Sequence, residues 1–133
     1  MVIYDTYAWV EYFRGSNKGK IVRDLLEVED GYTPSITLAE LARKYLREGF
    51  TEEELRKRLR FIEAKTVIIQ INSEIAIKAA KIYLQLHNHA LKEKLRTPSL
   101  ADAIVYATTK TLNKKLVTGD KLFQKLPSII YLE

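Results

Sequence analysis

The chain has 133 residues, of which 47% are hydrophobic and 29% charged, a composition typical of a globular domain and not of a disordered or membrane-embedded protein. It contains no cysteine, which excludes disulfides, thiolate metal sites and cysteine nucleophiles. The formal net charge of +5 is compatible with a polyanionic partner such as RNA, although many small basic domains bind none.

The N-terminal stretch MVIYDTYAWVEYF lacks a basic start followed by a cleavable apolar segment, and no apolar run reaches transmembrane length. We therefore expect a cytoplasmic protein with no membrane contact. No repeat, low-complexity segment or linker divides the chain, so we expect a single domain over residues 1–133.

The apolar pattern predicts short strands that alternate with helices. In chain order we expect a strand at 1–4, a short helix ending near 15, a helix at 18–28, a weak strand at 32–36, helices starting at 37 and 51, a strand at 67–71, a long helix from 73 toward 94, a helix around 102, and strands at 115–118 and 129–132. We expect Ser73 to cap the long helix, and Ile21 and Leu46 to face inward. This alternation predicts an α/β fold with a mostly parallel sheet covered on both faces.

Four acidic residues follow strands or begin helices in this arrangement. Asp5 ends the first strand and Asp120 comes just after the fourth. Glu40 and Asp102 each lie three residues after a candidate helix cap, in TLAE and SLAD. Because strand carboxyl ends and the following helix amino ends meet at one edge of a parallel sheet, we expect the four carboxylates to share a cleft.

Each acid also has a simpler explanation. A Thr or Ser followed three residues later by an acid is a capping box, so Glu40 and Asp102 could serve their own helices. Asp5 and Asp120 could be turn residues. We favour one shared site, because Asp102 lies in the nearly apolar stretch SLADAIVYAT and four separate explanations at one edge are less economical.

Clustered carboxylates without histidine or cysteine are typical ligands of a hard divalent cation, Mg²⁺ or Mn²⁺. In the absence of metal they would raise one another's pKa values. We therefore expect Asp102 to pair with a metal ion, directly or through water.

With these motifs in place, the sequence resembles the PIN-domain ribonucleases, in particular the VapC-type toxins of prokaryotic toxin–antitoxin pairs. The resemblance lies in VIYDTYAW, TPSITLAEL, SLADAIVYAT and LVTGDKLF, which occur in the family's order and span almost the whole chain. Two positions depart from the family pattern. Tyr7 replaces a small residue, and Leu122 stands where many relatives carry a further acid, which weakens any second metal site.

The resemblance implies a three-layer α/β/α PIN-like fold and a metal-dependent endoribonuclease that is inhibited by an antitoxin and forms a homodimer. Asp5, Glu40, Asp102 and Asp120 match the family's catalytic, metal-binding acids, and Thr6 and Thr118 match supporting hydroxyl positions. The number of metals, the general base (Glu40 or Asp102), the RNA target and the antitoxin stay open. The alternative is a PIN fold that acts as a catalytically silent binding or scaffold module.

Residues that would hold the RNA are not identified by the sequence. Arg14, Lys18 and Lys20 could reach phosphates or lie in a solvated loop. Trp9, Tyr12 and Phe13 could stack on bases, but their helical spacing favours core packing. We expect His87 and His89 to be surface residues without a catalytic role.

Overall fold

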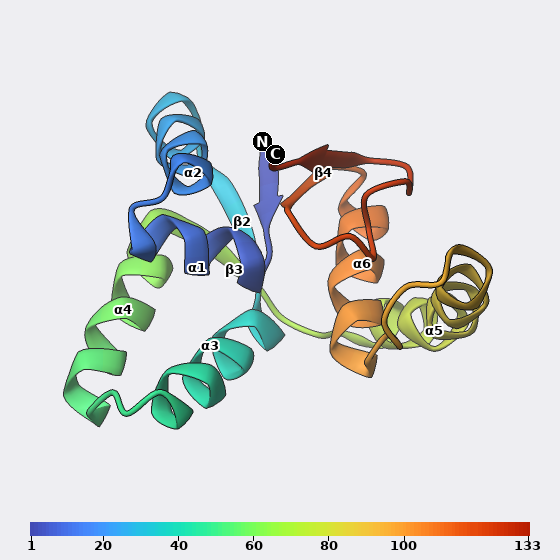
Figure 1. Cartoon of the computed structure of the whole chain (residues 1–133), viewed down its shortest axis with the longest axis horizontal. Coiled ribbons are helices and arrows are strands. Elements are labelled where there is room, and N and C mark those ends of the chain that lie inside the picture. The colour runs from blue at the N-terminus through green and yellow to red at the C-terminus, as the bar shows by residue number, and fades with distance from the viewer.

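A computed structural model describes residues 1–133 as five strands and six helices (Figure 1). The strands are β1 (Val2–Tyr4), β2 (Gly31–Pro34), β3 (Thr66–Ile69), β4 (Lys115–Thr118) and β5 (Ile129–Tyr131). The helices are α1 (Thr6–Arg14), α2 (Asn17–Val28), α3 (Ser35–Arg47), α4 (Glu52–Lys65), α5 (Ser73–Glu93) and α6 (Leu100–Leu112). No helix combines the length and apolar character that crossing a membrane requires.

All neighbouring strands pair in parallel, in the order β3-β2-β1-β4-β5. The chain leaves β1 toward β2 on one side and later returns to place β4 on the other side. The strand order therefore reverses between β1 and β4, and in parallel sheets this switch point is where sites form, beyond the carboxyl ends of the strands.

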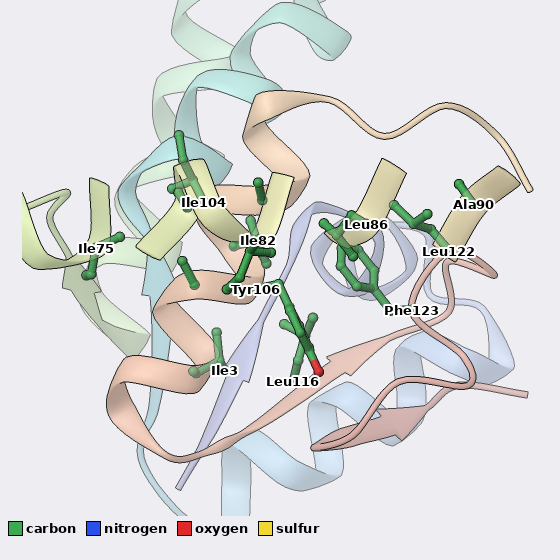
Figure 2. Close-up of a cluster of buried hydrophobic side chains, with 14 residues drawn as sticks. Ile3, Ile75, Ile82, Leu86, Ala90, Ile104, Tyr106, Leu116, Leu122 and Phe123 are labelled. Atoms are coloured by element: carbon green, nitrogen blue, oxygen red, sulfur yellow. The ribbon is translucent and has the colours of Figure 1, made fainter. Parts of the chain in front are cut away.

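The helices cover the two faces of the sheet in separate groups, with α1 to α4 on one side and α5 and α6 on the other (Figure 1). Successive residues of a strand point to opposite faces, so Ile3 and Leu116 join the core under α5 and α6 (Figure 2). Val2, Tyr4 and Val117 join the core under α1 to α4. The three-layer α/β/α fold predicted from the sequence is confirmed, with a sheet that is wholly parallel.

Some local predictions were wrong. Helix α3 begins at Ser35, so Thr37 lies inside the helix and not at its cap. Asn72 caps α5 through its side chain, which accepts a hydrogen bond from the Ile75 N–H, in place of the predicted Ser73. Leu46 and Ile21 are about half exposed, at 53% and 43%, because each lies at the edge of the apolar stripe of its helix.

A directed chain of buried hydrogen bonds fixes α1 against the sheet. The Trp9 indole N–H donates to the Thr33 hydroxyl at 3.1 Å, and Thr33 and Thr66 share a hydrogen bond of 2.7 Å. The Thr66 hydroxyl donates to the Ile62 carbonyl, so Thr33 is the donor in the threonine pair. Helices α1 and α4 and strands β2 and β3 are thereby joined through three side chains.

We expect Thr33→Val to lower the free energy of unfolding by about 1–3 kcal/mol, because it leaves the buried Trp9 N–H without an acceptor. Urea unfolding followed by tryptophan fluorescence measures this effect. Thr108→Val is the matched control, since that buried hydroxyl bonds only to a carbonyl of its own helix and its loss should have less than about 1 kcal/mol effect. Equal losses in the two variants would contradict the role given to Thr33.

Candidate active site

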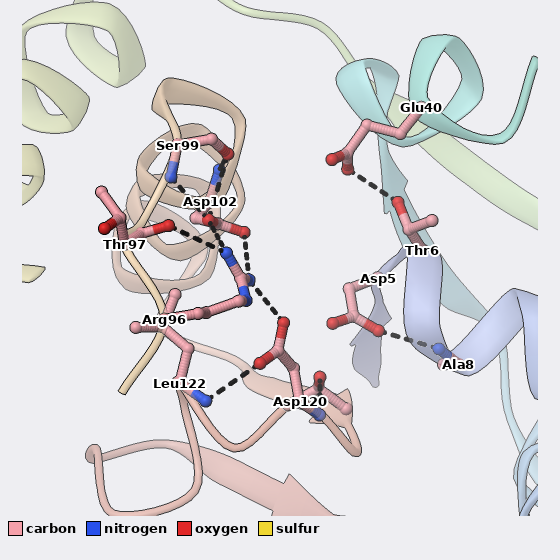
Figure 3. Close-up of polar contacts among 11 residues, drawn as sticks. Asp5, Thr6, Ala8, Glu40, Arg96, Thr97, Ser99, Asp102, Asp120 and Leu122 are labelled. Carbon is pink, nitrogen blue, oxygen red and sulfur yellow. Dashed lines mark hydrogen bonds and ion pairs between the residues drawn. The ribbon is translucent and has the colours of Figure 1, made fainter. Parts of the chain in front are cut away.

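All four acidic residues predicted from the sequence line one cavity of about 370 Å³. Asp5 follows β1 directly, and Asp120 lies in the turn after β4, on the two sides of the switch point. Glu40 is in the second turn of α3 and Asp102 in the first turn of α6. The predicted convergence of the four carboxylates at one sheet edge is therefore present in the structure (Figure 3).

Asp5 is the most enclosed of the four, with 6% of its surface exposed. It caps α1, since its Oδ1 accepts a hydrogen bond of 2.9 Å from the Ala8 N–H. Burial raises the pKa of Asp5 to about 7, and the charges of Asp120 and Glu40 add to this effect, while bonds from Thr118 and Ala8 oppose it. A carboxyl in this environment favours a nearby cation.

Glu40 is held by Thr6, whose hydroxyl donates to Glu40 Oε1 at 2.7 Å. The capping explanation for Glu40 is wrong, because α3 starts before Thr37 and has no side-chain cap. Burial raises the pKa of Glu40, and the charge of Asp102 acts in the same direction, against the bond from Thr6. Glu40 is thus directed at the cavity by a side chain from α1 and not by its own helix.

Asp102 has both of the roles that the sequence left open for it. It forms a capping box with Ser99, whose backbone N–H donates to Asp102 Oδ2 at 2.7 Å and whose hydroxyl accepts from the Asp102 N–H. The same carboxylate lines the cavity. The cap fixes the orientation of the side chain, so one oxygen is held by the helix start and the other faces the cavity.

Asp120 is anchored by the turn in which it lies. Its Oδ1 accepts a hydrogen bond of 2.9 Å from the Leu122 N–H, and its own N–H donates to the Thr118 hydroxyl at 3.1 Å. Thr118 thus supports both Asp5 and Asp120, as Thr6 supports Glu40. Leu122 is fully buried, and its contribution to the site is its backbone N–H.

Arg96 lies among the carboxylates and was not singled out from the sequence. Its Nη1 donates to Asp102 Oδ2 at 2.8 Å, and its Nη2 donates to Asp102 Oδ1 at 3.0 Å and to Asp120 Oδ2 at 2.5 Å (Figure 3). The pKa of Arg96 is raised, mainly by its hydrogen bond to Asp102, so the guanidinium stays charged. The sequence predicted a metal ion as the partner of Asp102, and in this structure its partner is a guanidinium.

In this arrangement no three acidic or histidine side chains lie close enough to hold one metal ion. The donor set nevertheless fits a hard cation. In each of the four carboxylates, a nearby N–H or hydroxyl donates a hydrogen bond to one oxygen, and the other oxygen faces the cavity (Figure 3). Two of the cavity-facing oxygens, on Asp102 and Asp120, are bonded to Arg96.

Other side chains complete the walls of the cavity. Tyr7 packs its ring against Gly119, where an added Cβ would lie 2.2 Å from the ring, and its hydroxyl accepts a hydrogen bond from Lys18. Arg14 and Lys44 bring further positive charge to the cavity wall. Glu11, also missed from the sequence, lines the cavity, but Ser16 donates to its Oε2 at 2.8 Å.

The remaining candidates lie elsewhere. Lys20 does not line the cavity. Trp9 is fully buried and stacks on Phe13, which confirms the expectation of core packing. His87 and His89 are half-buried on α5, more enclosed than predicted, and neither lines the cavity.

Comparisons with known proteins relate this chain to one family. The sequence model of the PIN domain family matches residues 2–129. No curated protein sequence matches the chain significantly.

Several solved structures have a backbone fold similar to that of this chain. A toxin–antitoxin complex from Klebsiella pneumoniae is 23% identical with a TM-score of 0.70, over 100% of this chain and 98% of that one. The sarcin–ricin-loop-cleaving toxin VapC20 of Mycobacterium tuberculosis is 13% identical with a TM-score of 0.74, over 96% of both chains. VapBC2 of Rickettsia felis, solved with a promoter DNA fragment, is 19% identical with a TM-score of 0.68, over 98% of this chain and 97% of that one. The TM-scores show a common fold, and at these low identities the likeness shows the fold alone.

We expect the stability of the metal-free protein to fall as the pH rises from about 4 to about 7. The pKa of Asp5 is about 7 in the folded protein and near 4 in the unfolded chain, so the folded state binds more protons between these values. Asp5→Asn removes this effect and keeps an acceptor for Ala8, so its stability relative to wild type should increase with pH, by at most about 4 kcal/mol.

Urea unfolding in EDTA at pH 5 and pH 8 measures this difference. Asp24→Asn, a change at an exposed acid on α2, is the control and should show no comparable pH dependence. A stability difference between Asp5→Asn and wild type that does not change with pH would show that Asp5 ionises normally.

Proposed function

The chain belongs to the PIN domain family, and from this premise we propose that it is a metal-dependent endoribonuclease, the toxin of a toxin–antitoxin pair. The observation that carries the proposal is the cavity in which Asp5, Glu40, Asp102 and Asp120 each present one oxygen. A silent scaffold has no use for four mutually repelling carboxylates held this way.

The four carboxylates would hold Mg²⁺ or Mn²⁺, which prefer oxygen ligands. Such an ion would supply Lewis-acid chemistry at this site, by polarising the phosphodiester and by favouring deprotonation of water. Glu40 is the better placed general base, because its raised pKa and its Oε2, free of hydrogen bonds, suit it to accept the proton of the attacking water. Both oxygens of Asp102 already accept hydrogen bonds.

RNA would approach the cavity past Arg14 and Lys44, which line it and whose side chains are 68% and 42% exposed. Each also pairs with an acid close to it in the sequence, Arg14 with Glu11 and Lys44 with Glu48. Cations at these positions can bind phosphates on either side of the scissile bond without reading the base sequence. The positive net charge of the chain favours the same class of substrate.

A cognate antitoxin is the second partner in this proposal. The similar structures include toxin–antitoxin complexes from Klebsiella pneumoniae and Rickettsia felis. A segment of the antitoxin that covers the cavity would stop cleavage, most directly by placing a basic side chain among the carboxylates. The proposed place of action is the cytoplasm.

We expect wild-type protein to cleave RNA in Mg²⁺ or Mn²⁺ and not in EDTA, and Asp5→Asn to be slower by about 100-fold or more because the cavity loses its most buried ligand. End-labelled single-stranded and structured RNAs report the cleavage. Asp24→Asn is the matched control, since it removes the same charge from the exposed face of α2. Cleavage that survives both EDTA and Asp5→Asn would contradict the proposal.

If no RNA is cut, the melting temperature decides between a narrow substrate range and a scaffold. Millimolar Mn²⁺ should raise it for wild type and not for Asp5→Asn. Unchanged melting of the wild type would favour the silent scaffold.

We also expect a homodimer at micromolar concentration. The basis of this expectation is Ile77, Leu84 and Leu91 on α5, which recur every seven residues and are 60–70% exposed. Sedimentation should show Leu84→Lys as a monomer and the control Val28→Lys on α2 as a dimer, whereas a monomeric wild type would contradict the expectation.

A further inference from the structure

The carboxylates of the cavity form two pairs that differ in how their charge is balanced (Figure 3). Asp102 and Asp120 share the Arg96 guanidinium. Asp5 and Glu40 make no ion pair and accept hydrogen bonds only from neutral donors. On one side of the cavity, Arg96 therefore offsets part of the negative charge through ion pairs, whereas the carboxylates on the other side have no ion-pair partner.

Arg96 links the start of α6 to the turn after β4, because it bonds to an aspartate in each. It binds Asp102 of α6 with both arms of its fork and reaches Asp120, in the turn after β4, with Nη2. A planar fork suits this geometry, which the point charge of a lysine cannot reproduce. The guanidinium thus sets the separation of the two carboxylates.

The guanidinium is the movable partner in this contact. Asp102 and Asp120 are 12% and 24% exposed and are anchored by backbone N–H groups, whereas Arg96 is 46% exposed. Arg96 lies in the short loop between α5 and α6 and bonds its own loop only weakly, at 3.4 Å to the Thr97 carbonyl. The side chain can leave the cavity without any change in the core.

The oxygens that Arg96 occupies are those that a metal would need. Asp102 Oδ2 and Asp120 Oδ1 are held by the Ser99 and Leu122 N–H groups, which leaves Asp102 Oδ1 and Asp120 Oδ2 to face the cavity. Both of these oxygens accept from Nη2 of Arg96. A cation that takes them as ligands has to replace the guanidinium.

We propose that Arg96 is a positioning residue that holds Asp102 and Asp120 together in the metal-free protein and is displaced from them when a divalent cation binds. This inference rests on the proposed function, because it assumes a metal site at these acids. Under this proposal, the metal ion competes with the Arg96 guanidinium for the two aspartates, and this competition sets the affinity for metal. The carboxylates stay ordered without metal, at the expense of metal affinity.

Calorimetric titration with Mn²⁺, without RNA, tests this competition. We expect Arg96→Gln to bind Mn²⁺ roughly tenfold tighter than wild type or more, within the usual range of coupling between sites. Arg14→Gln is the control, because it removes the same charge from the same cavity but contacts neither Asp102 nor Asp120, and it should change the affinity by less than about threefold. Arg96→Lys should lie between wild type and Arg96→Gln.

Equal Mn²⁺ affinity of Arg96→Gln and Arg14→Gln would overturn the proposal, since only the charge of the cavity would then matter. Weaker binding by Arg96→Gln than by wild type would also overturn it. Nitrogen-15 NMR of the Arg96 guanidinium in wild type covers the case in which Arg96→Gln does not fold. Saturating Mg²⁺ should shift and broaden its Nη–H signals, and unchanged signals would contradict displacement.

Failure of this inference is distinguishable from failure of the proposed function. If wild type binds metal and cleaves RNA but the arginine variants bind metal equally, only the inference is wrong. If neither wild type nor Arg96→Gln binds metal, both are wrong.

Discussion

The repulsion among four carboxylates in one half-enclosed cavity is the constraint to which the rest of the site responds. The pKa values of Asp5 and Glu40 are raised, first because burial disfavours their ionised forms and also because neighbouring carboxylates repel them. Asp102 and Asp120 instead share the charge of Arg96. The two responses occur in the same cavity, and under the proposals made above a divalent cation bound there would replace both.

The parallel sheet creates this constraint. Because β1 and β4 are neighbours with the same direction, the residues after them, Asp5 and Asp120, project from the same edge at the switch point. Helices α3 and α6, on opposite faces of the sheet, bring Glu40 and Asp102 to this edge. The chain of hydrogen bonds from Trp9 through Thr33 fixes α1, and α1 in turn carries Thr6, which orients Glu40. Core packing thereby controls the geometry of the cavity.

The sequence predicts the layers of the fold and the four acids, because both follow from local patterns. Short apolar strands alternate with helices. Asp5 and Asp120 follow strands and Asp102 lies at a helix start, whereas Glu40 lies one turn further into its helix than the pattern predicts. The residue at which a helix begins was harder to predict. Helix α3 begins at Ser35, directly after β2 and Pro34, and not at the TLAE pattern. The capping box at Ser99 shows that a local pattern can be correct and still not exclude a second role for Asp102.

Arg96 could not be predicted in the same way. It is one of 22 lysines and arginines, and nothing in its neighbours marks it. Its role depends on a contact with Asp120 across the fold, 24 residues away, which only the tertiary structure shows. Its one local clue is a position six residues before Asp102, in the loop that leads into α6. Charged loop residues beside a predicted acidic cluster therefore merit attention as its counter-ions.

The most direct measurement of the central claim is a crystal structure of the wild-type protein with Mn²⁺, using anomalous scattering to locate the ion. The account predicts an anomalous peak inside the cavity, among Asp5, Glu40 and the cavity-facing oxygens of Asp102 and Asp120, with Arg96 turned away from the two aspartates. A structure from crystals grown in saturating Mn²⁺ that shows no peak in the cavity, and Arg96 still bound to both aspartates, would contradict it.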